Sequence, residues 1–435
     1  MKPYNVETTI EKLSQEGRGM AHVQGFPTFI TGALPGETVE ARIIERHRGI
    51  QEGLCTAVKT ASAERVTPAC PHFGVCGGCS LQHWDHARQV AHKEAALFSL
   101  CQHVVGVEPE RRLPALVGAP WGYRHRARMG LRWHRNQARM FMGFREAHGN
   151  KVTNSTTCSI LHPALVEPLF ALSPVLSTLS NRESIPQIEM AYGGQDTPAL
   201  VLRHLEPFTT EDLLKLQEFS RTHAVRLYGQ SKGYESVVAL DPTLPFDLSY
   251  QVLGLTLNFH PLDFTQIHLA LNEKMVAQAL DLLAIAPADR VVDLFCGVGN
   301  FTLPLAQKAA EVLGVEGDAA MTKRVMQNAA LNSLTNVRAV AANLFQPLPT
   351  DRWVKGPYDK VLLDPPRSGA FEVLPTIVQW RPKNIVYVSC NPTTLVRDLA
   401  FLVKNHGYRL KALGLMDMFP HTGHSEAMAL LEANG

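Results

Sequence analysis

The chain has 435 residues, and its 42 lysine and arginine residues against 40 aspartate and glutamate residues leave a net charge of only +2. A charge balance this even excludes nucleic-acid binding through the global field, so any such binding must come from a local basic patch. No run of 18 apolar residues predicts a membrane span, and the first 12 residues lack the apolar core of a secretory signal, so we expect a cytoplasmic protein without a membrane partner.

The first two zones of the chain differ in their residue patterns. Residues 1–60 alternate in short stretches broken by glycine and proline, a pattern typical of small β-barrels, and helical periodicity is almost absent. Residues 61–262 combine a cysteine cluster, an arginine-rich stretch and further strand-like segments, which predicts an α+β domain. A helix-like insert at 92–104 has the pattern of an element that packs on a neighbouring domain.

Three of the eight cysteines, Cys70, Cys76 and Cys79, lie close together in the stretch CPHFGVCGGCS. Thiols in a reducing compartment serve more often as metal ligands or catalytic groups than as crosslinks. An odd number of cysteines also cannot pair completely into disulfides. The spacing therefore predicts a metal centre with a more distant fourth cysteine.

The arginine-rich stretch lies at 122–146. In a strand, Arg124, Arg126, Arg128 and Arg132 share one face, and apolar side chains share the other. Because guanidinium groups pair with phosphates and stack on unpaired bases, this face predicts an RNA-binding surface. The alternative is an ordinary solvated edge strand, although edge strands favour lysine.

From residue 263 onward, strand and helix patterns alternate strictly. Strands that are apolar on both faces and are joined by helices are typical of a doubly wound, mostly parallel sheet. The expected strands are RVVDLFC, EVLGVE, VRAVAAN, DKVLLDPP, NIVYVSC and EAMALLEA, and the expected helices are FTLPLAQKAA, AMTKRVMQNAALNS and TTLVRDLAFLVKNHG.

Polar residues follow several of these strands and predict a cofactor site. DLFCGVGNF places glycines between a strand and a helix, where the backbone can approach a ligand. Glu316 ends the next strand and is placed to bond ribose hydroxyls, Asn343 is placed to reach an adenine ring, and Asp364 follows a fourth strand. These strand ends match the S-adenosylmethionine site of Rossmann-like methyltransferases. The alternative is a pair of turn glycines and a helix-capping asparagine without a ligand.

Cys390 stands where the strand NIVYVSC stops, a position that faces the crevice of such a sheet. The alternative is a packed core thiol. A thiolate here is able to add to C6 of a pyrimidine and make C5 nucleophilic enough to accept a methyl group. Glu426 is a candidate base for the C5 proton, although alone it could be a solvated carboxylate. Arg367 follows Asp-Pro-Pro where amino-methyltransferases carry an aromatic ring, which disfavours methylation of an exocyclic nitrogen.

Together these motifs resemble the RNA uracil-5-methyltransferase family. DLFCGVGNF, LLDPPRSG, YVSCNPTTLVRDL and HTGHSE occur in the family's order, and FTQ precedes them. The resemblance implies that Cys390 is the nucleophile and Glu426 the general base. It also implies a pocket for S-adenosylmethionine, with Asp364 and Gln266 facing both the cofactor and uracil. The implied cofactor-binding residues are Gln266, Phe295, Asn300, Glu316, Asn343 and Asp364.

The resemblance extends upstream of the methyltransferase motifs. Some members of the family begin with a TRAM domain, an OB-like RNA-binding β-barrel, and residues 1–60 look like one. Some also carry an iron–sulfur centre with three cysteines spaced as in this chain, and Cys158 stands at the position of the family's last ligand. The resemblance therefore implies a [4Fe-4S] cluster. Four thiolates also bind tetrahedral zinc, although zinc sites usually pair two Cys-x2-Cys knuckles. The implied ligands are Cys70, Cys76, Cys79 and Cys158.

The expected architecture has three parts: a TRAM-like barrel over 1–60, a central α+β domain with the cluster over 61–262, and a Rossmann-like α/β methyltransferase over 263–435. This layout most resembles the bacterial family members that methylate uracil C5 in 23S ribosomal RNA. That activity would proceed through a covalent bond between Cys390 and uracil C6. A transfer RNA uracil-5-methyltransferase and a non-catalytic iron–sulfur RNA-binding protein remain alternatives. We expect 23S ribosomal RNA as partner, no DNA, and a monomer.

Overall fold

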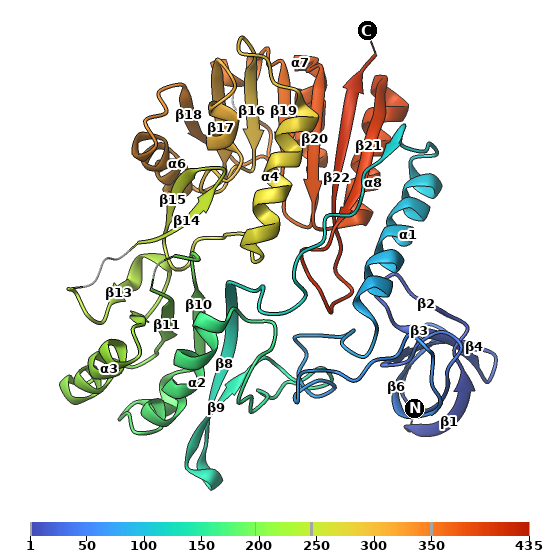
Figure 1. Cartoon of the computed structure of the whole chain (residues 1–435), viewed down its shortest axis with the longest axis vertical. Helices are drawn as coiled ribbons and strands as arrows, with labels where there is room; N and C mark the ends of the chain where they lie inside the picture. The colour runs from blue at the N-terminus through green and yellow to red at the C-terminus, as the bar shows by residue number, and fades with distance from the viewer. Residues whose placement is uncertain (1, 196, 244–246, 349–350, 435) are drawn as a thin grey trace.

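A computed structural model describes residues 2–195, 197–243, 247–348 and 351–434 (Figure 1). The N-terminal part is a six-stranded sheet of order β1-β5-β6-β4-β3-β2. Alternate residues of its strands, such as Val39, Ala41 and Ile43, are buried in a small core, as the period of a β-strand requires. The strands are β1 (Tyr4–Thr9), β2 (Lys12–Leu13), β3 (Gly19–Val23), β4 (Phe26–Thr31), β5 (Thr38–His47) and β6 (Ile50–Thr60).

The central part is a second six-stranded sheet, of order β13-β12-β11-β10-β8-β9, with two helices on one face. The helix α2 (Pro163–Ser177) buries leucines at spacings of three and four, which form one apolar stripe against the sheet, and α3 (Thr210–Thr222) packs beside it. The strands are β8 (Arg126–His134), β9 (Arg139–Gly143), β10 (Gln187–Ala191), β11 (Ala199–Arg203), β12 (Arg226–Gln230) and β13 (Val237–Ala239).

The C-terminal part is an eight-stranded sheet of order β18-β17-β16-β19-β20-β22-β21-β7. The first five strands in this order are parallel, whereas β22 runs antiparallel to both of its neighbours. The strands are β7 (Arg111–Arg112), β16 (Arg290–Leu294), β17 (Glu311–Glu316), β18 (Val337–Ala341), β19 (Lys360–Leu363), β20 (Asn384–Ser389), β21 (Tyr408–Met416) and β22 (Glu426–Ala433).

Helices cover both faces of this sheet, so its strands are apolar on both sides as predicted. Val291 and Val292 on β16 belong to different buried clusters, one on each face. One face packs on α4 (Leu269–Leu283), α5 (Thr302–Ala306) and α6 (Ala319–Leu331). The other face packs on α1 (His86–Val104), α7 (Leu374–Trp380) and α8 (Pro392–His406).

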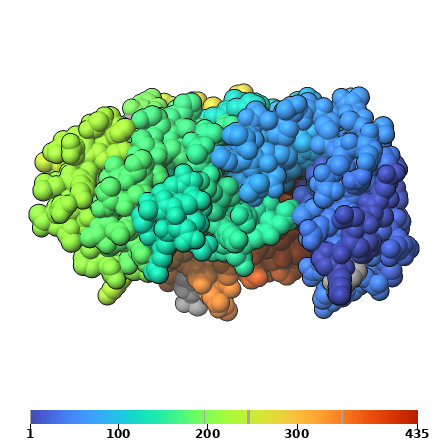
Figure 2. All heavy atoms as spheres, turned by 90° about the horizontal axis from the view of Figure 1, so that it is seen from below, coloured from blue at the N-terminus to red at the C-terminus, as the bar shows by residue number. Residues whose placement is uncertain are grey.

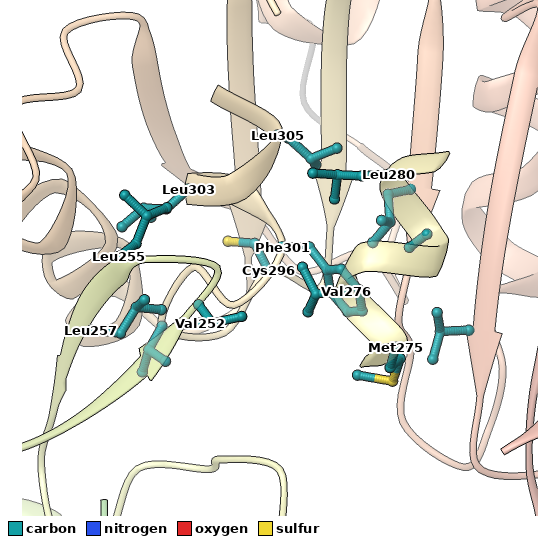
Figure 3. Packing of buried hydrophobic residues seen from close by; sticks show 14 of the residues in the cluster. Val252, Leu255, Leu257, Met275, Val276, Leu280, Cys296, Phe301, Leu303 and Leu305 are labelled. Atoms are coloured by element: carbon teal, nitrogen blue, oxygen red, sulfur yellow. The ribbon is translucent and has the colours of Figure 1, made fainter. Parts of the chain in front are cut away.

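Two segments that precede residue 263 lie against the C-terminal sheet. The helix α1 buries Leu97, Phe98 and Cys101 in the same cluster as β20 and α8, and β7 pairs with β21. The hairpin of β14 (Leu248–Val252) and β15 (Leu255–Phe259) packs toward α4 and α5 (Figure 3). Cys296 is buried in the cluster that these elements form.

Five short 3-10 helices complete the secondary structure of the described ranges: η1 (Arg135–Gln137), η2 (Arg182–Ser184), η3 (Tyr234–Ser236), η4 (Arg352–Lys355) and η5 (Phe371–Val373). None of the helices in these ranges has the length and apolar character needed to cross a membrane. Seen from below, the N-terminal and central parts lie side by side, and C-terminal atoms are visible between and beneath them (Figure 2).

Candidate active site

The topology of the C-terminal sheet brings the sequence-predicted site residues to one edge. Parallel strands place their carboxyl ends together, and β22 runs in the opposite direction, so its first residue lies at the same edge. A cavity of about 620 Å³ opens there. It is lined by all eight residues expected at the active site: Gln266, Phe295, Asn300, Glu316, Asn343, Asp364, Cys390 and Glu426.

Glu316 organises the loop that follows β16. Its carboxylate accepts hydrogen bonds from the N–H groups of Gly297, at 3.0 Å, and Gly317, at 2.7 Å. Gly297 has a φ of 53°, a left-handed conformation that favours glycine. Thr302, which stands where a dinucleotide site would have a third glycine, donates a hydrogen bond to the buried Asp293 at 2.6 Å. The loop is therefore fixed by strand-end carboxylates rather than shaped for a pyrophosphate.

Two further residues that the sequence did not single out hold Asn300. The amides of Asn300 and Asn272 on α4 exchange two hydrogen bonds of 2.8 Å, and the hydroxyl of Tyr250 on β14 donates to Asn300 Oδ1 at 3.0 Å. Tyr250 also lines the cavity. The hairpin and α4 thus fix the orientation of an amide at the cofactor-type end of the cavity.

An aromatic wall lies beside these groups. The rings of Phe295 and Phe345 are 5.6 Å apart, and Asn343 Oδ1 accepts a hydrogen bond from the Phe345 N–H at 3.0 Å. Phe345 was not predicted, because nothing in its local sequence distinguishes it from a surface phenylalanine. The combination of flat apolar surface and strand-end oxygens suits a purine nucleoside.

The same cavity is lined by two carboxyl groups, the half-buried Asp364 and the buried Glu426, and by one thiol, that of Cys390. Asp364 receives a hydrogen bond of 3.4 Å from Gln266 Nε2, whereas Glu426 Oε2 has no hydrogen-bond partner among the described residues. Burial raises the pKa of Asp364, and burial together with the neighbouring Asp364 raises the pKa of Glu426. A buried carboxyl group with an open oxygen is typical of a group that handles a proton.

Cys390 is half-buried beside these carboxyl groups. Burial, Glu426 and Asp364 raise the pKa of its thiol to about 11, and Arg367 acts in the opposite direction. Cys390 and Arg367 also line a second cavity of about 250 Å³, whose other walls come from α1, from residues 391–393 and 423–425, and from Gln15 and Glu16 of the N-terminal part. The sulfur is therefore reached from two sides, one of them facing the N-terminal barrel.

Comparison with known proteins places this geometry in a family. Residues 118–434 match the tRNA (Uracil-5-)-methyltransferase family, and residues 5–53 match the TRAM domain. The chain belongs to the tRNA (uracil-5-)-methyltransferase family. Its N-terminal barrel is a TRAM domain, as predicted.

Relatives of known name cover the full chain. A protein of Alkalilimnicola ehrlichii named 23S rRNA (uracil(1939)-C(5))-methyltransferase RlmD is 48% identical over 98% of this chain and 96% of its own length. A protein of the same name from Methylococcus capsulatus is 45% identical over 97% and 96%. The solved structure of Pyrococcus abyssi tRNA (uracil-54, C5)-methyltransferase, in complex with S-adenosyl-L-homocysteine, has 22% identity and a TM-score of 0.74, over 98% of this chain and 100% of that one. This last similarity shows a shared fold.

This family member brings its four predicted metal ligands to a separate cavity. Cys70, Cys76, Cys79 and Cys158 all line it, and each is half-buried. Burial and the neighbouring thiols raise the pKa of Cys79 to about 12. Within the described ranges, no three metal-binding side chains are grouped tightly enough to hold a single ion.

The arginine-rich stretch forms β8 and differs from its prediction in two respects. The apolar residues Ala127, Met129 and Leu131 are buried, as expected. However, β8 lies between β10 and β9, so the edge-strand alternative is wrong. Arg126 is turned inward, with Nη2 donating to Leu262 O at 2.6 Å, whereas Arg128 is largely exposed beside Glu189. Arg126 therefore supports the fold, and the basic surface is narrower than the sequence pattern predicted.

Proposed function

We propose that this protein transfers a methyl group from S-adenosylmethionine to C5 of a uracil in 23S ribosomal RNA. The observation that carries the proposal is the meeting of Cys390 and Glu426 in a cavity with cofactor-type strand ends. Identity of 43–48% over nearly the whole chain to proteins named for that reaction supports the choice of substrate. The proposed domains are the TRAM domain over 1–60, a central cluster and RNA-binding domain over 61–262, and the methyltransferase domain over 263–435.

The proposed cofactor site uses the strand-end residues described above. Glu316 would bond the ribose hydroxyls of the cofactor, and Phe295 and Asn343 would hold its adenine ring. Asn300 and Gln266 would contact the rest of the cofactor. The bound cofactor would supply an electrophilic methyl group on a sulfonium. Asp364 and Gln266 are joined by a hydrogen bond and line the cavity that Cys390 and the cofactor-type residues also line, which suits groups that contact both cofactor and uracil.

Cys390 would act as the nucleophile. Its thiolate forms a bond to uracil C6, and the C5–C6 π electrons move toward the C4 oxygen to give an enolate. C5 of this enolate then takes the methyl group, and the S–CH₃ bond breaks to leave S-adenosylhomocysteine. The raised pKa of Cys390 means that the thiol is mostly protonated in the free protein, so the addition to C6 would proceed from the small fraction that has lost its proton to solvent.

Glu426 would complete the reaction. Its carboxylate removes the C5 proton, the electrons of that C–H bond form the C5–C6 double bond, and the C6–S bond breaks to restore the Cys390 thiolate. The open Oε2 of Glu426 is available for this proton, because it has no hydrogen-bond partner within the part of the chain that the structure describes.

We further propose that the four cysteines hold a [4Fe-4S] cluster. Their arrangement around one cavity between residues 70–79 and 158 suits a cluster that stabilises this region. Protein purified without oxygen is expected to contain about four iron and four sulfide per chain. Cys158→Ala should lose most of this iron and unfold at a lower temperature, whereas Cys55→Ala should keep it. About one zinc per chain, without iron, would contradict the cluster.

Two classes of RNA are candidate substrates, namely 23S ribosomal RNA and transfer RNA. The 23S assignment rests on the full-length relatives, whereas the matched family and the solved P. abyssi structure are named for transfer RNA. We expect labelled methyl groups to be transferred to 23S ribosomal RNA fragments, with the label recovered as 5-methyluridine. Unmodified transfer RNA and DNA of equal length serve as controls. Transfer to transfer RNA alone would favour the second reading, and binding without transfer would favour a non-catalytic protein. We also propose that the protein acts as a monomer.

A further inference from the structure

Residues 417–425 connect β21 to β22 and lead directly to Glu426. Phe419 of this loop lines the cavity that holds the cofactor-type residues, whereas Gly423, His424 and Ser425 line the second cavity. The loop therefore forms part of the wall on both sides of Cys390. Glu426 is the first residue of β22 and pairs with Met416 at the end of β21, so this strand pair and the conformation of the loop together set where its carboxyl group lies.

The backbone and the ring of His421, in the middle of the loop, both contact residues that lie outside the loop. Its N–H donates to Gln89 Oε1 at 3.0 Å, and its carbonyl accepts from the N–H groups of Ser80, at 2.9 Å, and Leu81, at 3.0 Å. The ring of Trp121 stacks on the His421 ring at 3.9 Å. His421 has a φ of 64°, a left-handed conformation that few residues other than glycine adopt. Such a conformation persists where surrounding contacts fix it.

Other contacts anchor the same loop to α1 and its surroundings. Lys93 Nζ donates to Asp417 Oδ1 at 2.7 Å and to the carbonyl of Phe419 at 3.1 Å, and both charged groups are buried. The hydroxyl of Tyr123 donates to the carbonyl of Pro420 at 3.2 Å. The loop is thus fixed by residues far from it in the sequence as well as by the hydrogen bonds that Thr422 makes within it.

The side chain of Gln89 on α1 contacts both the loop and the segment that precedes α1. It is 1% exposed, and its Nε2 donates to the carbonyls of Leu81, at 3.0 Å, and Trp84, at 2.8 Å, while its Oε1 holds His421. Ser80 directly follows Cys79, one of the four proposed cluster ligands. One hydrogen-bond network therefore joins the cysteine segment to the loop that carries Glu426.

We propose that Gln89 is a positioning residue, which sets the place of Glu426 relative to Cys390 by holding His421. The inference rests on the proposed function, in which Glu426 removes the C5 proton after methyl transfer. Removal of the proton depends on the distance from the carboxylate to C5, whereas the preceding methyl transfer does not use Glu426. Loss of the Gln89 contact therefore slows release of the RNA from Cys390 more than it slows methyl transfer.

The test is the ratio of two rates in Gln89→Met, measured on the RNA that the wild-type protein methylates. In a single turnover, label bound to RNA reports transfer, and loss of the denaturation-resistant protein–RNA conjugate reports release. Release is expected to slow by about tenfold or more, and transfer by less than about threefold. The ratio does not depend on the folded fraction, because both rates come from the same active molecules.

Gln217→Met is the matched control, since Gln217 on α3 also donates a hydrogen bond, of 2.7 Å, to a backbone carbonyl, that of Leu240. Its ratio should equal that of the wild type. If Gln89→Met does not fold, Gln89→Asn, which keeps an amide but is one methylene too short to reach the His421 N–H, should show release that is slower than in the wild type. An unchanged ratio in the folded Gln89 variant overturns the positioning role alone. A wild-type protein that transfers no methyl group overturns the proposed function as well.

Discussion

Replacement of Glu426 by glutamine is expected to leave methylated RNA covalently attached to Cys390. The amide has the size of the carboxyl group but cannot accept the C5 proton, so the C6–S bond cannot break by elimination. Single-turnover methyl transfer should stay within about tenfold of the wild type, while release falls by at least about 10³-fold. Gel electrophoresis under denaturing conditions measures the conjugate directly.

The pH dependence of release supplies the control for this variant. Burial and Asp364 raise the pKa of Glu426, so at neutral pH much of this group is protonated, and the carboxylate fraction increases as the pH rises. Release in the wild type should therefore accelerate between about pH 6 and pH 9. The residual release of Glu426→Gln should lack this increase. Rapid, pH-dependent turnover by the variant would show that another group removes the proton.

Cys390→Ala is expected to abolish methyl transfer and to leave cofactor binding intact. Without the sulfur, uracil C5 does not become nucleophilic, so the rate should fall by at least about 10³-fold. Cys390 is not one of the expected cofactor-binding residues, so the dissociation constant for S-adenosylhomocysteine in calorimetry should change by less than about threefold.

Cys101→Ala provides the comparison for this loss. Cys101 is a buried thiol on α1, packed in the cluster beneath the C-terminal sheet. Its replacement removes a sulfur and some packing, but it should leave methyl transfer near the wild-type rate in the folded protein. Equal losses in both variants would assign the effect to stability rather than to nucleophilic chemistry.

The C-terminal fold could be predicted because each of its strands has a sequence pattern typical of a strand buried on both faces. Strands such as EVLGVE and EAMALLEA are apolar on both faces, which only a sheet covered on both sides accommodates, and the structure has them as β17 and β22. The same order of strands brings Glu316, Asn343, Asp364 and Cys390 to one cavity, since the carboxyl ends of parallel strands meet at one edge. Gln266, Phe295 and Asn300 line the same cavity, but they were expected there from the family resemblance alone.

Other features of the site depend on contacts that no local pattern encodes. Tyr250 holds Asn300 from 50 residues away, and Asn272 holds it from 28. Neither position has a distinctive neighbourhood in the sequence. Arg126 shares the strand period of Arg128, yet it turns inward because a carbonyl of residue 262 and Glu189 lie beside it. The left-handed backbone conformation of His421 likewise depends on contacts with residues 80–89, and the sequence of its own loop gives no sign of these contacts.

The covalent bond between Cys390 and the pyrimidine is the central claim, and 5-fluorouridine tests it most directly. Fluorine at C5 cannot leave as a proton does, so elimination stops after methyl transfer. Wild-type protein incubated with the methyl donor and 5-fluorouridine-containing RNA should give a conjugate that survives denaturation, with a methylated, fluorinated nucleotide on the Cys390 peptide. If a preparation that methylates ordinary RNA yields no conjugate, or one on another residue, the account is contradicted.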